Sequence, residues 1–111
     1  MQILKKIAFS SVDEESTSTK TLFLSYRSAG VITNTGTLCA SETANIPFYI
    51  YSSTRPVVSS LDVAYNTNNL SSPFNGGNKY YKVAFSDFVG DTYLVQIDGF
   101  GLITVIEYCG P

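Results

Sequence analysis

The chain has no histidine and no tryptophan, and its 111 residues include one methionine and two cysteines. Without histidine, the Ser-His-Asp and Cys-His arrangements of nucleophilic catalysis are excluded. Charged residues are scarce, at 14%, whereas they make up about 25% of typical soluble domains. The surface must therefore be covered largely by Ser, Thr and Asn, a mixture more typical of exposed β-sheets and of extracellular or virion surfaces than of a cytosolic enzyme.

Two further absences concern partners. The formal net charge is −2 and the sequence has no basic stripe to neutralise phosphates, so binding to nucleic acid is not expected. No apolar run approaches the roughly 20 residues of a membrane span, so a membrane is not an expected partner either.

The N-terminus does not read as a signal peptide. The first six residues carry the positive charge of a signal peptide at Lys5 and Lys6, but the apolar stretch Ile7–Phe9 after them is too short for one. The chain is then mature as given, exported by another route, or released by cell lysis.

The two cysteines, Cys39 and Cys109, allow two states. A disulfide between them would close a long loop and stabilise the fold by about 4 kcal/mol. Without a signal peptide we favour two reduced thiols, buried as small apolar side chains, because cytosolic assembly keeps thiols reduced. Two cysteines without histidine do not make a structural zinc site.

Carboxylates are the remaining route to catalysis, since two of them could act as acid and base. The candidates are Asp87, Asp91, Asp98 and Glu107. Asp98 is explained by a turn, and the other three are typical of carboxylates that face water. Gly76-Gly77 before Lys79 lacks the spacing of a phosphate-binding loop, and the acidic residues lack EF-hand spacing. We therefore predict a protein that is not an enzyme and holds no cofactor or metal.

Alternation of apolar and polar residues, rich in β-branched and aromatic types, indicates strands throughout. The strongest signal is a hairpin, residues 92–98 and 102–108, around Asp98-Gly99-Phe100-Gly101. Asp-Gly supplies the positive φ of a tight turn, and the second glycine allows a bulge. Further strands are expected at 2–9, 21–26, 31–33, 46–51, 62–65 and 79–85, with a short strand or irregular crossing at 56–60. No segment has a convincing helical period with caps.

These elements predict a single all-β domain over residues 1–111, an antiparallel β-sandwich or open barrel of seven to eight strands. Residues 66–78 form a long polar loop. Residues 21–33 align without gaps on residues 92–104, and each segment continues to a cysteine. Two interpretations stay open: hairpins resemble one another over so short a window, or a hairpin unit is repeated at 21–39 and 92–109.

The eight tyrosines exceed what so small a core can hold. On strands with a core face, Tyr49, Tyr51 and Tyr80 are expected to point outward. Exposed tyrosine is favoured at protein interfaces and on sugar-binding faces, because it joins a large contact area to a polar tip. The three tyrosines mark either an ordinary amphipathic surface or a partner interface.

The string Pro73–Lys82 (PFNGGNKYYK), the run Val95–Asp98 (VQID), Gly101 and Cys109 resemble a small β module. That module occurs in virion and surface proteins of phages that infect Bacteroidota, including the crAss-like phages. The resemblance covers roughly residues 46–109 and brings no catalytic residues with it. It implies a structural role, either as a capsid auxiliary or decoration protein or as a module of a head or tail fibre. Because the module makes up most of this chain, a stand-alone auxiliary protein is favoured.

We therefore expect a non-enzymatic phage virion structural protein, made in the host cytoplasm and located in the virion. Its partner would be the major capsid protein or another virion protein, and self-association into a homo-oligomer stays open. The alternative is a carbohydrate- or host-surface-binding module of the fibre or adhesin type. That module would use the outward tyrosines and the loop at residues 66–78 for stacking and hydrogen bonds.

Overall fold

The computed structural model describes residues 19–53, 58–88 and 91–110, which form six strands and one short helix. The strands are β1 (Thr21–Arg27), β2 (Ile46–Ser52), β3 (Val63–Tyr65), β4 (Lys79–Phe85), β5 (Thr92–Ile97) and β6 (Ile103–Gly110). The helix α1 is Leu38–Ser41, and a 3-10 turn spans Ser86–Phe88. Neighbouring strands pair antiparallel in the order β3-β2-β1-β4-β5-β6. The expectation of a mostly β, antiparallel protein is confirmed.

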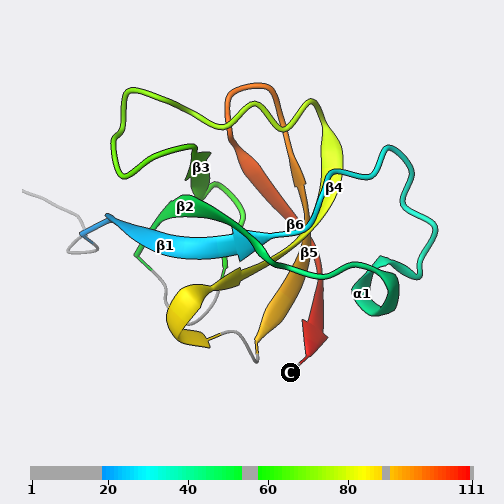
Figure 1. Cartoon of the computed structure of the whole chain (residues 1–111). Coiled ribbons are helices and arrows are strands. Elements are labelled where there is room, and N and C mark those ends of the chain that lie inside the picture. Colours follow the sequence, from blue (N-terminus) through cyan, green and yellow to red (C-terminus); the bar gives the residue numbers. More distant parts are fainter. Residues whose placement is uncertain (1–18, 54–57, 89–90, 111) are drawn as a thin grey trace, which may run out of the picture.

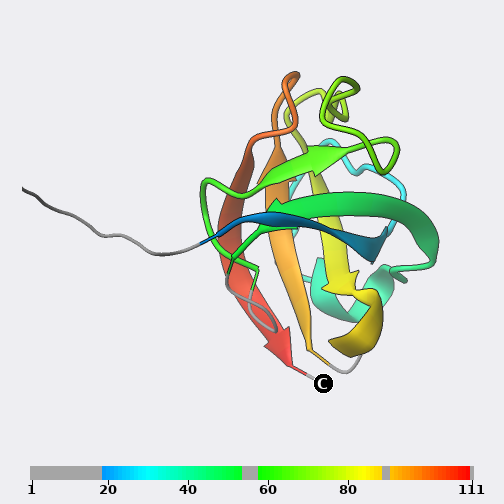
Figure 2. The ribbon, with the colours of Figure 1, turned by 90° about the vertical axis from the view of Figure 1, so that its left-hand side faces the viewer.

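Of the two expected architectures, the described residues do not show the sandwich. They form one curled sheet, a half-barrel, which is nearer to the expected open barrel, and it has six strands rather than seven to eight. β1 and β2 cross β4, β5 and β6 at a steep angle, so the sheet wraps around its concave side (Figures 1 and 2). The strand expected at 31–33 is reduced to an isolated bridge between Val31 and Tyr80. Residues 58–60 are irregular, and residues 2–9 and 56–57 lie outside the described residues.

The two segments of the internal alignment pair differently. β5 and β6 form the expected hairpin. β1 instead pairs with β2 and β4. In residues 28–37 after it, Ser28 N–H donates to Lys82 O at 2.9 Å and Val31 forms an isolated bridge with Tyr80. Residues 21–39 therefore do not form a hairpin. The alternating residues at 21–27 form β1, and both neighbours of β1 in the sheet, β2 and β4, come from later in the chain.

The hairpin turn is held by Asp98. Its Oδ1 accepts hydrogen bonds from the backbone N–H groups of Phe100 at 2.8 Å and Leu102 at 2.9 Å. The positive φ that we expected at Gly99 lies at Gly101 instead, with φ +86°. This arrangement is a longer turn closed by a bulge glycine, which also suits the right-handed twist of the strands.

The core fills the concave side of the curled sheet. Its residues alternate along the strands with outward-facing ones, as half-buried strands require. The buried cluster comprises Phe48, Ile50, Val58, Ala64, Phe74, Tyr81, Val83, Phe85, Tyr93, Val95, Ile97 and Ile103. Edge-to-face ring pairs join Phe48 to Phe74 and Phe74 to Tyr81 at centroid distances of 5.8 and 5.5 Å, a geometry that aromatic quadrupoles favour.

The two edges of the sheet meet along a seam between residues 60–64 and 101–105. Three backbone bonds form it: Leu61 N–H to Ile103 O at 2.9 Å, Ile103 N–H to Asp62 O at 2.8 Å, and Ala64 N–H to Gly101 O at 2.7 Å. A fourth bond runs from Val105 N–H to Ser60 Oγ at 2.9 Å. The seam pairs edge groups that would otherwise be open to other strands.

On the convex side, α1 packs against β4 and β5. Leu38 of α1 and Leu94 of β5 are buried there, outside the main core cluster. A disulfide joins Cys39 of α1 to Cys109 of β6, with their Cα atoms 5.3 Å apart. Our expectation of two reduced thiols was wrong, because it was argued from compartment alone, whereas the sheet brings residues 70 apart in sequence within bonding reach.

Substituting Gly101 tests the seam. A Cβ at this position would lie 2.3 Å from Ala64 O, and the residue has φ +86°. We expect Gly101→Ala to lower the free energy of unfolding by about 3 kcal/mol, because both backbone conformation and seam are disturbed. The matched control is Gly36→Ala, at φ +81° with nothing within 4 Å, which should lose only about 1 kcal/mol. Urea unfolding measures both, and equal losses would contradict a role for the seam.

Asp62 provides a pH test of the same seam. Its buried carboxylate accepts a bond from Ser59 N–H at 2.9 Å. Burial raises its pKa above the usual 3.8, although bonds from Ser59 and Ser52 and the charge of Lys20 oppose the rise. A raised folded-state pKa gives stability that is present below 3.8 and is lost as the pH rises through the folded-state value. Asp62→Asn should therefore gain stability relative to the wild type as the pH rises from acid to neutral. Unfolding titrations that show parallel pH profiles would refute this.

Candidate interaction face

The convex side of β1, β2 and β3 carries two cross-strand rows of apolar and tyrosine side chains. The strand register aligns Leu24 with Tyr49 and Tyr49 with Tyr65 in one row. It aligns Leu22 with Tyr51 and Tyr51 with Val63 in the next. We call these six residues the tyrosine face: Leu22, Leu24, Tyr49, Tyr51, Val63 and Tyr65. Directly opposed side chains in a sheet stabilise one another, so the rows form a continuous surface.

The tyrosine face is partly open to solvent. Leu24 is 41% exposed, and the other five residues are partly exposed. The rings of Tyr51 and Tyr65 meet edge to face with centroids 6.3 Å apart. Lys20 Nζ lies 5.8 Å from the Tyr51 ring centroid. None of the six residues carries a charge, so the face offers apolar contact area with hydroxyl groups as its polar tips.

Over β4 and β5, the convex side of the sheet is covered rather than open to solvent. There α1 covers the sheet, and Leu94 has no exposed surface. Over β1, Leu24 keeps two fifths of its surface in water. Scattered exposed apolar residues are ordinary, but a contiguous set on one face is typical of an interaction site.

The structure brings together two of the three tyrosines named from the sequence. Tyr49 and Tyr51 are neighbours on β2 and lie within the tyrosine face. Tyr80 lies on β4, opposite Gln96, and its backbone bonds with Val31 beyond the end of β1. Tyr80 is thus separate from the rows. The sequence analysis missed the other four residues of the face, and their outward alternation on predicted strands was the signal that could have found them. They are Leu22, Leu24, Val63 and Tyr65.

Arg27 is a second unusual residue, on the concave side at the end of β1. Its guanidinium carbon lies 4.5 Å from the Phe74 ring centroid and 5.9 Å from that of Tyr81. Nη1 donates to Ser28 O at 3.2 Å, while the buried Nε has no hydrogen-bond partner. Burial raises the pKa of Tyr81, whose hydroxyl donates to Gly76 O at 2.8 Å, and the charge of Arg27 opposes that rise. Arg27 thus closes one end of the core by stacking on aromatic rings.

Three of the four carboxylates considered for catalysis have structural contacts. Asp98 accepts the turn bonds. Asp91 accepts the Tyr108 hydroxyl at 2.7 Å, and this bond is the main reason that the pKa of Tyr108 is raised. Asp87 bonds with Ser86 at 3.4 Å, and Glu107 is exposed on β6. Over the described ranges, no group of three or more His, Cys, Asp or Glu residues could hold a metal ion.

Comparisons of this chain with protein-family models, with curated proteins and with solved structures found no match. A search of the described residues for a helix long and apolar enough to span a membrane found none.

Two substitutions at Arg27 separate stacking from charge. Arg27→Lys keeps the charge but loses the flat guanidinium, and an ammonium is more strongly hydrated. We expect it to lower the free energy of unfolding by about 2 kcal/mol. Arg27→Met keeps apolar contact with the rings and removes the unpartnered Nε, so it should stay within about 1 kcal/mol of the wild type. Urea unfolding measures the stability of both variants. A stable Lys variant beside an unstable Met variant would show that the charge of Arg27, and not its stacking, stabilises the fold.

Proposed function

We propose that this chain is a non-enzymatic structural protein of a phage particle, which attaches to the particle surface through the tyrosine face. The observation that carries the proposal is the pair of uncharged rows across β1, β2 and β3, partly open to solvent. Interfaces are enriched in tyrosine and depleted of charge at their centre. The partner is the major capsid protein or another virion protein with an apolar surface of matching shape.

The resemblance of residues 46–109 to modules of phage virion proteins supports the location in a particle. The half-barrel supports the mode of binding, since a curved sheet holds both rows in fixed register. A preorganised face loses little conformational entropy when it binds. The low share of charged residues, 14%, suits attachment by apolar contact rather than by ion pairs.

The alternative, a carbohydrate-binding module, has less support in the loop at residues 66–78. Asn66 Nδ2 donates to Ser72 Oγ and to Pro73 O, each at 3.2 Å. The Oδ1 atoms of Asn69 and Asn75 accept bonds from Ser71 and Gly77 N–H groups. These amides hold the loop itself, whereas a sugar site needs convergent polar groups that are available to the ligand.

Substitutions in the tyrosine face test the attachment. We expect the double variant Leu24→Ser/Tyr49→Ser to bind particles about 30-fold more weakly, the size of one lost hot spot. Co-sedimentation of purified protein with particles that lack it gives the affinity. Binding should change little between low and moderate salt, because screening acts on exposed charges and not on apolar contact.

The matched control is Tyr80→Ser, which removes a partly exposed tyrosine outside the tyrosine face. It should bind as the wild type does. Equal losses in the control and the double variant, or collapse of binding in moderate salt, would remove the tyrosine face from the proposal.

The location is tested by mass spectrometry of purified virus particles from the source culture, with copy number measured against the major capsid protein. A high, fixed ratio is the expected result. A few copies per particle would place the protein in the tail, fibres or portal region instead. Absence from particles would overturn the virion proposal and promote the surface-binding alternative.

A further inference from the structure

We propose that the Cys39–Cys109 disulfide is a redox-controlled latch that holds α1 on the convex side of the sheet. The latch is open in a reducing cytosol and closes when the chain meets an oxidising environment. This inference does not depend on which partner the tyrosine face binds. It rests on how α1 is attached to the rest of the molecule.

α1 has little to hold it in place by itself. It is four residues long, and Thr37 before it makes no side-chain capping bond. Isolated helices need some 12–15 residues to be even marginally stable in water. Leu38 is the buried residue of α1, and exposed residues 32–37 precede it.

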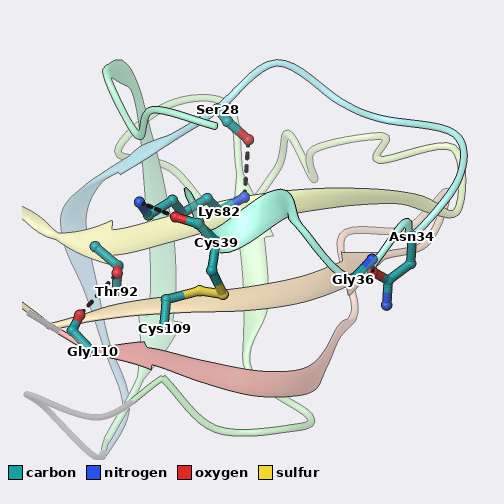
Figure 3. Close-up of a disulfide and its surroundings, with 8 residues drawn as sticks. All are labelled: Ser28, Asn34, Gly36, Cys39, Lys82, Thr92, Cys109 and Gly110. Carbon is teal, nitrogen blue, oxygen red and sulfur yellow. Dashed lines mark hydrogen bonds between the residues drawn. A yellow bond between two sulfur atoms is a disulfide. The ribbon is translucent and has the colours of Figure 1, made fainter. Parts of the chain in front are cut away.

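Two bonds fasten α1 to the sheet, as Figure 3 shows. Lys82 Nζ on β4 donates to Cys39 O at 2.7 Å. The disulfide joins Cys39 to Cys109 on β6. Because the first is a single hydrogen bond from a flexible side chain, the covalent bond is the main attachment.

The core of the half-barrel does not depend on the latch. None of the twelve residues of the main core cluster belongs to α1 or is a cysteine. The seam at residues 60–64 and 101–105 also lies elsewhere. Opening the latch therefore releases α1 and uncovers Leu94 while the sheet stays folded.

The chemistry needs an external oxidant, and a small disulfide such as oxidised glutathione supplies it. One cysteine thiolate attacks the glutathione disulfide, which gives a mixed disulfide and one glutathione thiolate. The second cysteine thiolate then displaces the other glutathione from the mixed disulfide. The two protein thiols lose two electrons and two protons in total, the glutathione disulfide gains the electrons, and the two glutathione thiolates take up the two protons, which gives two molecules of reduced glutathione. Cys39 and Cys109 are both partly exposed, so a small disulfide can reach them.

The compartment sets the state of the latch. Disulfides persist outside the cell, whereas the cytosol keeps cysteine thiols reduced. A chain made in a host cytoplasm would carry Leu94 uncovered until its release, and α1 would then be fixed over it.

The test follows amide exchange by NMR on the full chain, equilibrated in glutathione buffers from reducing to oxidising, with disulfide content read by thiol alkylation and mass spectrometry. Within α1 and its end, the reporters are Ser41 N–H, bonded to Thr37 O, and Glu42 N–H, bonded to Leu38 O. Reduction should speed their exchange about tenfold or more, as local opening does. Ile103 N–H in the seam is the internal reference. Loss of the cross-link lowers the stability of the whole fold, but Ile103 should stay protected in the reduced protein while the two α1 amides lose their protection.

The matched control is the double variant Cys39→Ala/Cys109→Ala, whose α1 amides should exchange fast in every buffer. Unchanged α1 exchange on reduction would overturn the latch, because other contacts would then hold the helix. Loss of protection at Ile103 in the reduced protein would overturn it too, by showing that the sheet does not stay folded without the disulfide. A disulfide that persists at the glutathione ratio of the cytosol would overturn redox control, because the latch would then be closed in both environments.

Discussion

The seam between residues 60–64 and 101–105 is the contact on which the rest of the half-barrel depends. It joins β3, one edge of the sheet, to the start of β6, the other edge. Without it the sheet would be an open ribbon, with one face of its core in water. Gly101 lies at one end of the seam, where its backbone approaches Ala64 more closely than a residue with a side chain would allow. Closing the edges also removes the template that an open sheet offers to other chains.

The part of β6 beyond the seam is protected in another way. Register shifts interrupt its pairing with β5 between Leu94 and Val95 and again between Thr92 and Tyr93. Such bulges raise the local twist and make an edge a poor partner for regular pairing. Contact with a partner is therefore better served by the side chains of the tyrosine face than by strand addition. This is why we propose β1, β2 and β3 as the site of attachment.

The sequence predicted what depends on local pattern. Alternation located β4 over its full length and β5–β6 to within two residues at each end. It could not predict what depends on residues far apart in the chain. The seam, the disulfide and the position of α1 all join segments that only the curl of the sheet brings together. The sequence analysis found no convincing helix, because a four-residue helix such as α1 is too short to show a 3.6-residue period.

For the candidate site, too, the sequence predicted what depends on local pattern and not what depends on strand order. Outward alternation singled out Tyr49 and Tyr51 but gave no means to exclude Tyr80, since strand order decides which outward residues are neighbours. Strand order also makes the two halves of the convex side comparable. Over β4 and β5, Leu94 is buried on the side where α1 packs, and α1 is joined to β6 by a disulfide. Over β1, β2 and β3, the tyrosine hydroxyls make partial exposure tolerable, because each ring keeps a polar tip in water. A face of Leu and Val alone would favour indiscriminate association. A face of tyrosines can stay soluble and still dock on a complementary surface, which is the property that attachment to a particle requires.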